Sequence, residues 1–130
     1  MKIPTNLKYS DTDEWVLVDG NIATIGITDY AQSQLSDIVY VEFKVEVGDE
    51  VKKDSILVTL DSAKATADVN LPVSGKVSEV HTNLPDIMEH INSDPYGDGW
   101  MLKLQLTNPG ELARLMDAAA YDAYCQKRSH

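Results

Sequence analysis

The chain has 130 residues, of which 43% are hydrophobic, and its 21 acidic and 11 basic side chains give a net charge of −10. This length suits a single domain over residues 1–130, and the hydrophobic content is sufficient for a folded core. The acidic balance argues against nucleic acid and anionic membranes as partners, because both bind basic surfaces. We see no apolar run long enough to cross a membrane, and no signal or transit peptide at the start.

Residues 15–18 and 22–27 are apolar runs joined by a turn that contains Gly20. Glycine readily adopts the positive φ that tight hairpins require, so this segment predicts two paired strands. Residues 28–35 predict a short helix, for which Thr28 is a suitable N-cap.

A clear strand signal follows in residues 39–47, where apolar residues alternate with tyrosine, lysine and glutamate. Because successive side chains point to opposite faces of a strand, we expect Val39, Val41 and Phe43 to face the core. Replacement of a fully buried Phe43 by alanine would then cost about 3–5 kcal/mol.

Residues 55–60 form a short run rich in β-branched residues, and residues 66–73 alternate between apolar and polar. Both patterns are typical of strands, and the short polar link between them predicts a hairpin with Lys64 at its tip. Such a lysine is either a solvated turn residue or a residue displayed for modification. The hairpin alone does not choose between the two.

The remainder of the chain predicts more short elements. Residues 76–80 and 100–106 are expected strands, residues 83–88 a helical turn, residues 94–99 a loop, and residues from about 108 to 126 a helical segment. Many short strands with few helices indicate a mostly β fold, as a small barrel or sandwich.

The sequence lacks the motifs of a self-sufficient enzyme. It has no glycine-rich phosphate loop, and its three histidines and single cysteine, Cys125, are too few for a zinc cluster. One cysteine cannot form an internal disulfide, which fits a reducing compartment. We expect Cys125 to be a packing or surface residue.

The displayed lysine is therefore the main chemical feature. An exposed lysine is a cation and a poor nucleophile, but acylation of its amine would attach a neutral, extended arm. A tethered arm raises the local concentration of its reactive group at each docked partner. The difficult chemistry would then belong to the cofactor and the partners.

Several segments in order resemble the glycine cleavage H-protein family over essentially the whole chain. They include the lipoyl-lysine motif and a late signature, and they are residues 7–9, 13–16, 23–32, 61–65, 68–69, 72–75, Asn92 and 94–100.

The resemblance implies a flattened lipoyl-type barrel or sandwich of two small antiparallel sheets, with short helices and the C-terminal helical segment. It implies that Lys64 carries lipoate in amide linkage. Asp61, Ser62 and Asp68 would shape the hairpin or be recognised by the lipoyl-attaching enzyme. Glu14 would contact the loaded arm in a surface cleft, and the alternative for Glu14 is a solvated residue at a strand start.

The resemblance also implies a non-catalytic carrier subunit with defined partners. These are the pyridoxal-phosphate-dependent glycine decarboxylase (P protein), the tetrahydrofolate-dependent aminomethyltransferase (T protein) and dihydrolipoyl dehydrogenase (L protein). The carrier would pass the aminomethyl group of glycine from the first to the second, and the third would reoxidise it. We expect a cytoplasmic monomer, with the mature form of a mitochondrial protein as the alternative location.

The chain departs from the family at several positions, one of which is the linker of residues 43–48, where the common form contains proline. Asp61 stands where glutamate is usual, which shortens the side chain and keeps its charge. Asp13 and Gln34 stand where histidine occurs in members of the family, so a histidine contact to the arm is in doubt. Asp54 stands where glycine is common, and aspartate tolerates left-handed backbone better than most residues.

Three alternatives remain open from the sequence. A lipoyl domain of a 2-oxo acid dehydrogenase shares the displayed lysine, but it is shorter and usually continues through a flexible linker. A biotin carrier typically has methionine on both sides of its lysine, where this chain has Ala63 and Ala65. An H-like protein that donates lipoyl groups to other enzymes without glycine cleavage fits the same residues.

Overall fold

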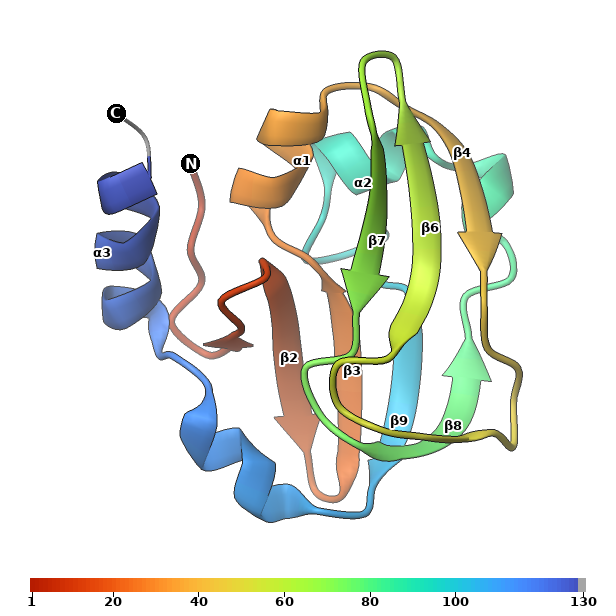
Figure 1. Cartoon of the computed structure of the whole chain (residues 1–130), viewed down its shortest axis with the longest axis vertical. Helices are drawn as coiled ribbons and strands as arrows, with labels where there is room; N and C mark the ends of the chain where they lie inside the picture. Colours follow the sequence, from red (N-terminus) through yellow and green to blue (C-terminus); the bar gives the residue numbers. More distant parts are fainter. Residues whose placement is uncertain (129–130) are drawn as a thin grey trace.

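Two antiparallel sheets form the body of the protein in a computed structural model that describes residues 1–128 (Figure 1). The strands are β1 (Lys8–Tyr9), β2 (Glu14–Asp19), β3 (Ile22–Ile27), β4 (Ile38–Phe43), β5 (Glu50–Val51), β6 (Ile56–Ser62), β7 (Thr66–Asn70), β8 (Gly75–Val80) and β9 (Leu102–Leu106). The larger sheet has the order β1-β2-β3-β9-β8-β5, and the smaller sheet has the order β4-β6-β7. The predicted mostly β fold with two antiparallel sheets is confirmed.

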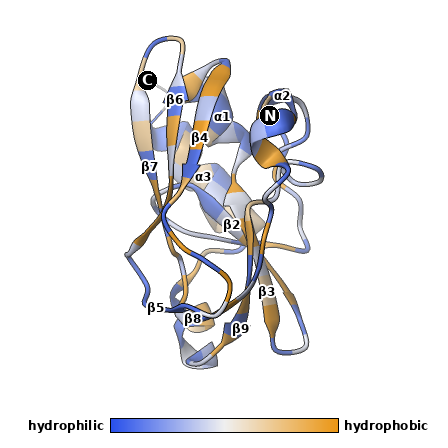
Figure 2. Cartoon of the chain, turned by 90° about the vertical axis from the view of Figure 1, so that its right-hand side faces the viewer, coloured by the Kyte–Doolittle hydropathy of each residue, from blue (hydrophilic) through white to orange (hydrophobic). Residues whose placement is uncertain are grey.

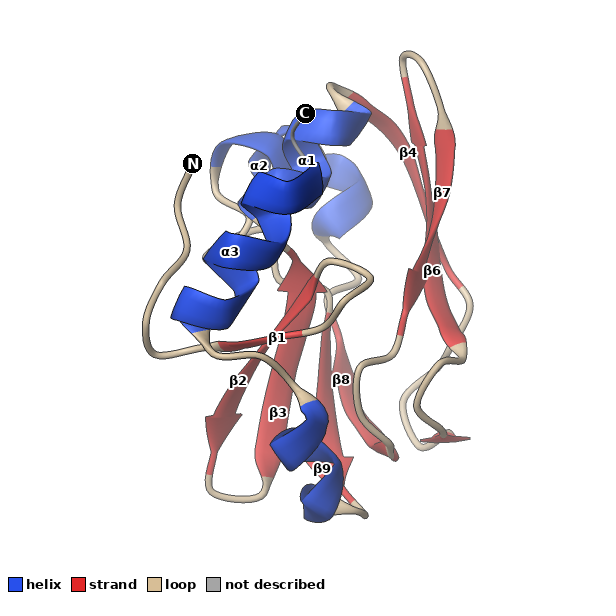
Figure 3. Cartoon of the chain, turned by 60° about the vertical axis from the view of Figure 1, so that its left-hand side comes forward, coloured by secondary structure: helices blue, strands red, loops and turns tan. Residues whose placement is uncertain are grey.

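Short helices complete the chain. They are α1 (Asp29–Leu35), α2 (Glu89–Ser93), α3 (Ala118–Arg128) and the 3₁₀ helices η1 (Leu84–Asp86) and η2 (Pro109–Arg114). Figure 3 shows α1, α2 and α3 grouped at one end of the larger sheet, the same end at which the β6–β7 turn projects. The expected C-terminal helical segment thus consists of η2 and α3.

Local sequence explains the first hairpin and the helix after it. Gly20 adopts a φ of +62°, and Asp19 pairs with Ile22 across the two-residue turn. The Thr28 side chain accepts a hydrogen bond from the backbone N–H of Ala31 at 3.2 Å. The predicted N-cap at Thr28 is therefore confirmed, and it satisfies one of the free donors at the start of α1.

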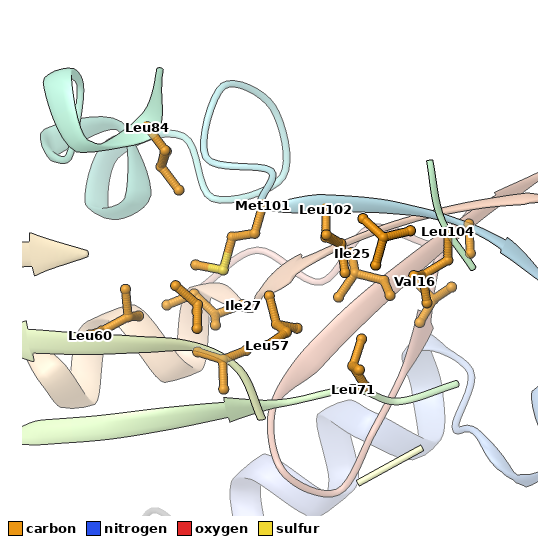
Figure 4. Close-up of a cluster of buried hydrophobic side chains, with 14 of the residues drawn as sticks. Val16, Ile25, Ile27, Leu57, Leu60, Leu71, Leu84, Met101, Leu102 and Leu104 are labelled. Carbon is orange, nitrogen blue, oxygen red and sulfur yellow. The ribbon is translucent and has the colours of Figure 1, made fainter. Parts of the chain in front are cut away.

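The main hydrophobic core lies between the two sheets. Figure 2 shows hydrophobic segments in β4 and β6, and the buried residues of these two strands are Ile38, Val41, Leu57, Val58 and Leu60. Figure 4 shows side chains from both sheets and from the connecting segments in this core, namely Val16, Ile25, Ile27, Leu57, Leu60, Leu71, Leu84, Met101, Leu102 and Leu104. Burial of this apolar surface is the dominant favourable term in folding.

A second cluster of buried side chains joins α3 to the edge of the larger sheet. Its members are Leu7, Tyr9, Trp15, Tyr30, Tyr121 and Cys125. Tyr9 and Tyr121 stack in parallel with their ring centroids 4.6 Å apart. Cys125 is thus a buried packing residue, and the alternative of a surface cysteine is wrong.

The predicted core face of β4 is partly wrong. Val41 is buried, but Val39 is 55% exposed and Phe43 is only partly buried. The pairing of β4 with β6 shifts between Ile38 and Tyr40, so the strict alternation is interrupted there. Such a bulge reorients the side chains beside it, which places Ile38 inside and Val39 outside. The strand also ends at Phe43, four residues before the predicted end.

Candidate functional site

Lys64 lies at the tip of the hairpin between β6 and β7 (Figure 1). The Ser62 hydroxyl accepts hydrogen bonds from the backbone N–H groups of Lys64 at 3.3 Å and Ala65 at 3.0 Å, and it lies 3.1 Å from the Ala65 carbonyl to which it donates. The Ser62 N–H also donates to that carbonyl at 2.7 Å. The Lys64 side chain is exposed, and its amine has no hydrogen bond or ion pair within residues 1–128. The turn is therefore ordered by its own backbone while the amine stays accessible.

Two aspartates below the tip form matching cross-strand hydrogen bonds. The Thr66 hydroxyl donates to Asp61 at 2.8 Å, and the Thr59 hydroxyl donates to Asp68 at 3.0 Å. Each aspartate is paired directly with its threonine across β6 and β7. Cross-strand pairs of this kind stabilise a hairpin by fractions of a kcal/mol to about 1 kcal/mol each.

Glu14, the first residue of β2, is buried with only 2% of its surface exposed. Its carboxylate accepts hydrogen bonds from the hydroxyls of Ser10 at 2.7 Å and Thr12, and from the backbone N–H of Asn70 at 3.4 Å. The alternative of a solvated Glu14 is therefore wrong. Burial raises the pKa of Glu14 to about 7, although the three hydrogen bonds partly oppose that rise.

Glu14 lies in the wall of a surface cleft of about 180 Å³. Helix α1 forms a second wall, and strand β7, which leads away from the lysine hairpin, forms a third. The lining residues are Thr12, Asp13, Glu14, Ile27, Ala31, Gln34, Leu35, Ala67, Asp68 and Val69. The cleft combines apolar side chains with carboxylates, a composition suited to a ligand that has an apolar chain and a cationic end.

The structure thus divides the residues singled out from the sequence into two groups. Glu14 and Asp68 line the cleft, while Lys64, Asp61 and Ser62 are not among its lining residues. The cleft begins at Ala67, three residues from Lys64, which is about 10 Å along a strand. A flexible group attached at Lys64 would therefore have the cleft beside it.

Gln34 and Asp13, noted as departures from the family, also line this cleft. Asp13 has a φ of 74°, which is uncommon for a residue other than glycine. Arg128 and Tyr121 from α3 bind its carboxylate. Asp54 likewise has a positive φ, of 75°, as expected from its turn.

Sequence reasoning missed several contributors to this site, among them Ser10, Thr12 and Arg128. Ser10 and Thr12 donate hydroxyl hydrogen bonds to Glu14. Their positions, four and two residues before Glu14, were the feature of the sequence that could have indicated these contacts. Arg128 was missed because its contact with Asp13 spans 115 residues.

The described part of the chain shows two further absences. Residues 1–128 contain no group of three or more histidine, cysteine or acidic side chains that could hold a metal ion. Within the same residues, no helix has the length and hydropathy that crossing a membrane would require.

Comparisons with known proteins agree on one family. A sequence model described as "Glycine cleavage H-protein" matches residues 7–128. The glycine cleavage system H protein of Symbiobacterium thermophilum is 51% identical over 125 residues, covering 96% of this chain and 97% of that protein. The mitochondrial glycine cleavage system H protein 2 of Arabidopsis thaliana is 47% identical and covers 94% of this chain and 78% of that protein.

A solved structure supports the same likeness. The crystal structure of a glycine cleavage system H protein from Mycobacterium marinum superposes with a TM-score of 0.83 at 33% identity. The match covers 93% of this chain and 97% of that chain.

Proposed function

Since the chain belongs to the glycine cleavage H-protein family, we propose that Lys64 is the residue through which it carries lipoate. Proteins of this family are non-catalytic lipoyl carriers that work with the P, T and L proteins of glycine cleavage. The chain is accordingly a carrier of the aminomethyl group of glycine, between the decarboxylase and the aminomethyltransferase. Dihydrolipoyl dehydrogenase then returns the carrier to its oxidised state.

The hairpin supplies the features that an attachment site needs. The Lys64 amine is exposed and unpaired among the described residues, and Ala63 and Ala65 leave space around it. The bound group supplies a disulfide that can accept the aminomethyl group. Attachment as an amide removes the lysine charge, and the hairpin provides an ordered base from which the arm extends.

We propose that the lipoyl-attaching enzyme recognises Asp61, Ser62 and Asp68 through the shape that they give the hairpin. Ser62 orders the turn, and the two aspartates hold the strands together through Thr66 and Thr59. A lipoyl-attaching enzyme must accept this hairpin in one conformation. The Asp61 side chain is shorter than the glutamate that is usual at this position, and it still accepts the hydrogen bond from Thr66. This contact supports recognition of the hairpin by the enzyme.

We further propose that the cleft receives the loaded arm and that Glu14 pairs with its amine. The carboxylate is fixed by Ser10 and Thr12, so it requires little reorganisation to meet a cation. An ammonium beside Glu14 would favour the ionised carboxylate, because opposite charges a few ångströms apart attract. Removal of the amine from bulk water would protect the carried group between enzymes.

Mass spectrometry tests the attachment. The full chain is produced in a lipoate-supplied host with a competent ligase, and Lys64→Arg is compared with Lys52→Arg, an exposed lysine in another turn. We expect one lipoyl group on the wild type and on Lys52→Arg, mapped to the peptide containing Lys64, and none on Lys64→Arg. A lipoyl group that persists in Lys64→Arg would overturn the assignment.

Reconstitution tests the carrier role. Lys64→Ala should fold normally and abolish glycine cleavage in the presence of the P, T and L proteins. Retained activity would contradict the carrier mechanism. A lipoylated wild type that supports no glycine cleavage, but passes its lipoyl group to other enzymes, would identify it as a lipoyl donor.

We also propose a cytoplasmic location. Bacterial relatives that cover nearly the whole chain support it. Fractionation of cells of the source organism should recover the protein with cytoplasmic enzymes. Its recovery in mitochondria would favour the location of the Arabidopsis relative.

A further inference from the structure

One amide side chain connects three segments beneath the lysine hairpin. Asn92, in α2, accepts a hydrogen bond from the backbone N–H of Ile38 through Oδ1 at 3.0 Å. Its Nδ2 donates to the Ser36 carbonyl at 2.8 Å and to Gln32 Oε1 at 3.1 Å. Asn92 therefore uses both amide protons and one acceptor position to bind the end of α1 and the start of β4.

The segment that Asn92 binds also contacts the hairpin tip. The Ala63 N–H, next to Lys64, donates to the Asp37 carbonyl at 3.1 Å. Ile38 pairs with Ser62 across β4 and β6. Residues 36–38 therefore support the base of the tip from one side.

The same segment continues from the helix that lines the cleft. Helix α1 contributes Ala31, Gln34 and Leu35 to the cleft wall, and Ser36 is its C-cap. Figure 1 shows α1 and α2 side by side below the β6–β7 turn. A shift of residues 36–38 would thus change the position of the hairpin tip relative to the cleft wall.

Two features indicate that this segment needs an external support. Ser36 has a φ of 62°, a conformation that a residue other than glycine keeps only where its surroundings enforce it. The β4–β6 pairing is irregular between Ile38 and Tyr40, so the sheet holds this end of β4 less firmly. Asn92 bonds to residues on both sides of Asp37 and supplies that support.

We propose that Asn92 is a positioning residue that fixes the lysine hairpin relative to the α1 wall of the cleft. It acts through Ser36, Asp37 and Ile38, and it touches neither Lys64 nor the cleft. The functional consequence rests on the proposed attachment of lipoate to Lys64. The positioning itself is a property of the unmodified chain.

Hydrogen exchange of backbone amides tests the positioning directly in the full, unmodified chain. In Asn92→Ala, the Ala63 amide should exchange on the order of tenfold faster than in the wild type, because the support of its acceptor Asp37 is lost. The Met101 amide, bonded to Ile25 in the larger sheet, serves as an internal reference and should not change. Equal acceleration of both amides would indicate general destabilisation and overturn the proposal, as would an unchanged Ala63 amide.

Two further variants sharpen the test. Asn92→Asp keeps an acceptor for Ile38 but loses both donors, so it should accelerate Ala63 exchange to a smaller or similar extent. If Asn92→Ala does not fold, Asn92→Asp alone tests the proposal. An Ala63 amide that exchanges in Asn92→Asp at the wild-type rate would then overturn it. Asn108→Ala makes the same change at an exposed asparagine that precedes η2 and makes no side-chain capping hydrogen bond, and it should behave as the wild type.

Lipoylation provides the functional readout. With a purified ligase, kcat/KM for Asn92→Ala should fall roughly fivefold or more, while Asn108→Ala should match the wild type. An unchanged kcat/KM would show that Asn92 does not contribute to lipoylation. A wild type that is not lipoylated would contradict the assignment of Lys64, and the exchange of Ala63 would still decide whether Asn92 positions the hairpin.

Discussion

Arg128, in the last turn of α3, forms a two-pronged ion pair with Asp13 beside the cleft. Its Nη1 lies 3.0 Å from Asp13 Oδ2, and its Nη2 lies 2.6 Å from Asp13 Oδ1. Tyr121 of the same helix donates a further hydrogen bond to Oδ1 at 2.8 Å. The C-terminal helix thereby holds a residue of positive φ that precedes Glu14.

The guanidinium of Arg128 also has aromatic neighbours. It lies over the rings of Tyr30 and Tyr124, 4.3 and 4.0 Å from their centroids. The hydrogen bonds that Arg128 donates to Asp13 raise the pKa of Arg128, so the guanidinium stays charged. Planar guanidinium groups suit both contacts, which a lysine in its place would not reproduce.

We predict that Arg128→Met lowers the free energy of unfolding by about 2 kcal/mol, because the loss of one partner leaves the half-buried Asp13 charge uncompensated. This value lies between those of exposed and fully buried pairs, since 28% of the Arg128 side chain and 18% of the Asp13 side chain are exposed. Urea unfolding measures the change. Lys127→Met, an exposed neighbour, is the control and should have little effect. Equal effects of the two variants would show that the ion pair contributes nothing.

The raised pKa of the buried Glu14 should be visible in the pH dependence of the free energy of unfolding. Its pKa is about 7 in the folded chain, against an ordinary value of 4.5 for a glutamate in water. The folded state therefore binds the Glu14 proton more tightly than the unfolded state does. The stabilisation that results is present at low pH and is lost as the pH rises toward 7. Glu14→Gln should remove a penalty on the order of 3 kcal/mol above neutral pH.

Urea unfolding between pH 5 and pH 8 checks this expectation. The stability difference between Glu14→Gln and the wild type should grow in favour of the variant up to about pH 7 and then level off. Glu79→Gln changes an exposed glutamate of β8 in the same way and should show no such trend. A Glu14→Gln variant that is uniformly less stable would show that its hydrogen bonds outweigh its burial.

The sequence predicted those features that depend on local patterns. A β-branched run before Lys64 and an alternating segment after it indicated the hairpin, and Thr28 at the start of a short helical segment indicated the cap. The lysine and its aspartates were found because they lie within eight residues of one another. The general fold followed from many short strands and from the resemblance to a family.

The remaining features depend on contacts that no local pattern encodes. Glu14 is a charged residue at a strand start, and the tertiary fold buries it and brings it to the backbone N–H of Asn70 in β7, which lies 56 residues away in the sequence. Asn92 joins segments 54 to 60 residues away. Val39 faces solvent because a bulge interrupts the alternation that predicted the opposite.

Ser62 offers a test of how the hairpin tip is ordered. In Ser62→Ala the turn loses one hydroxyl that serves three backbone groups, so lipoylation should slow several-fold, while stability falls by no more than about 1 kcal/mol. Ser78→Ala is a matched control, because the Ser78 hydroxyl also donates to a backbone carbonyl, that of Lys103 at 3.1 Å. Ligase kinetics and thermal unfolding measure the two effects. A normal lipoylation rate in Ser62→Ala would show that the backbone bonds alone order the turn.

Phe43 distinguishes the sequence expectation from the structure. A fully buried phenylalanine would lose about 3–5 kcal/mol on replacement by alanine. Phe43 is only partly buried at the end of the edge strand β4, where it packs against the main core. We therefore predict a smaller loss for Phe43→Ala, about 1–2 kcal/mol, because part of the ring stays in water in both states.

Leu57→Ala supplies the comparison, because Leu57 of β6 is fully buried in the same core. Its loss should be about 2–5 kcal/mol, since alanine leaves a cavity that the two sheets cannot close. Urea unfolding of both variants measures the ranking. A larger loss for Phe43→Ala than for Leu57→Ala would mean that the Phe43 ring is more deeply buried in the core than the structure shows. It would support the core face of β4 that the alternation predicted.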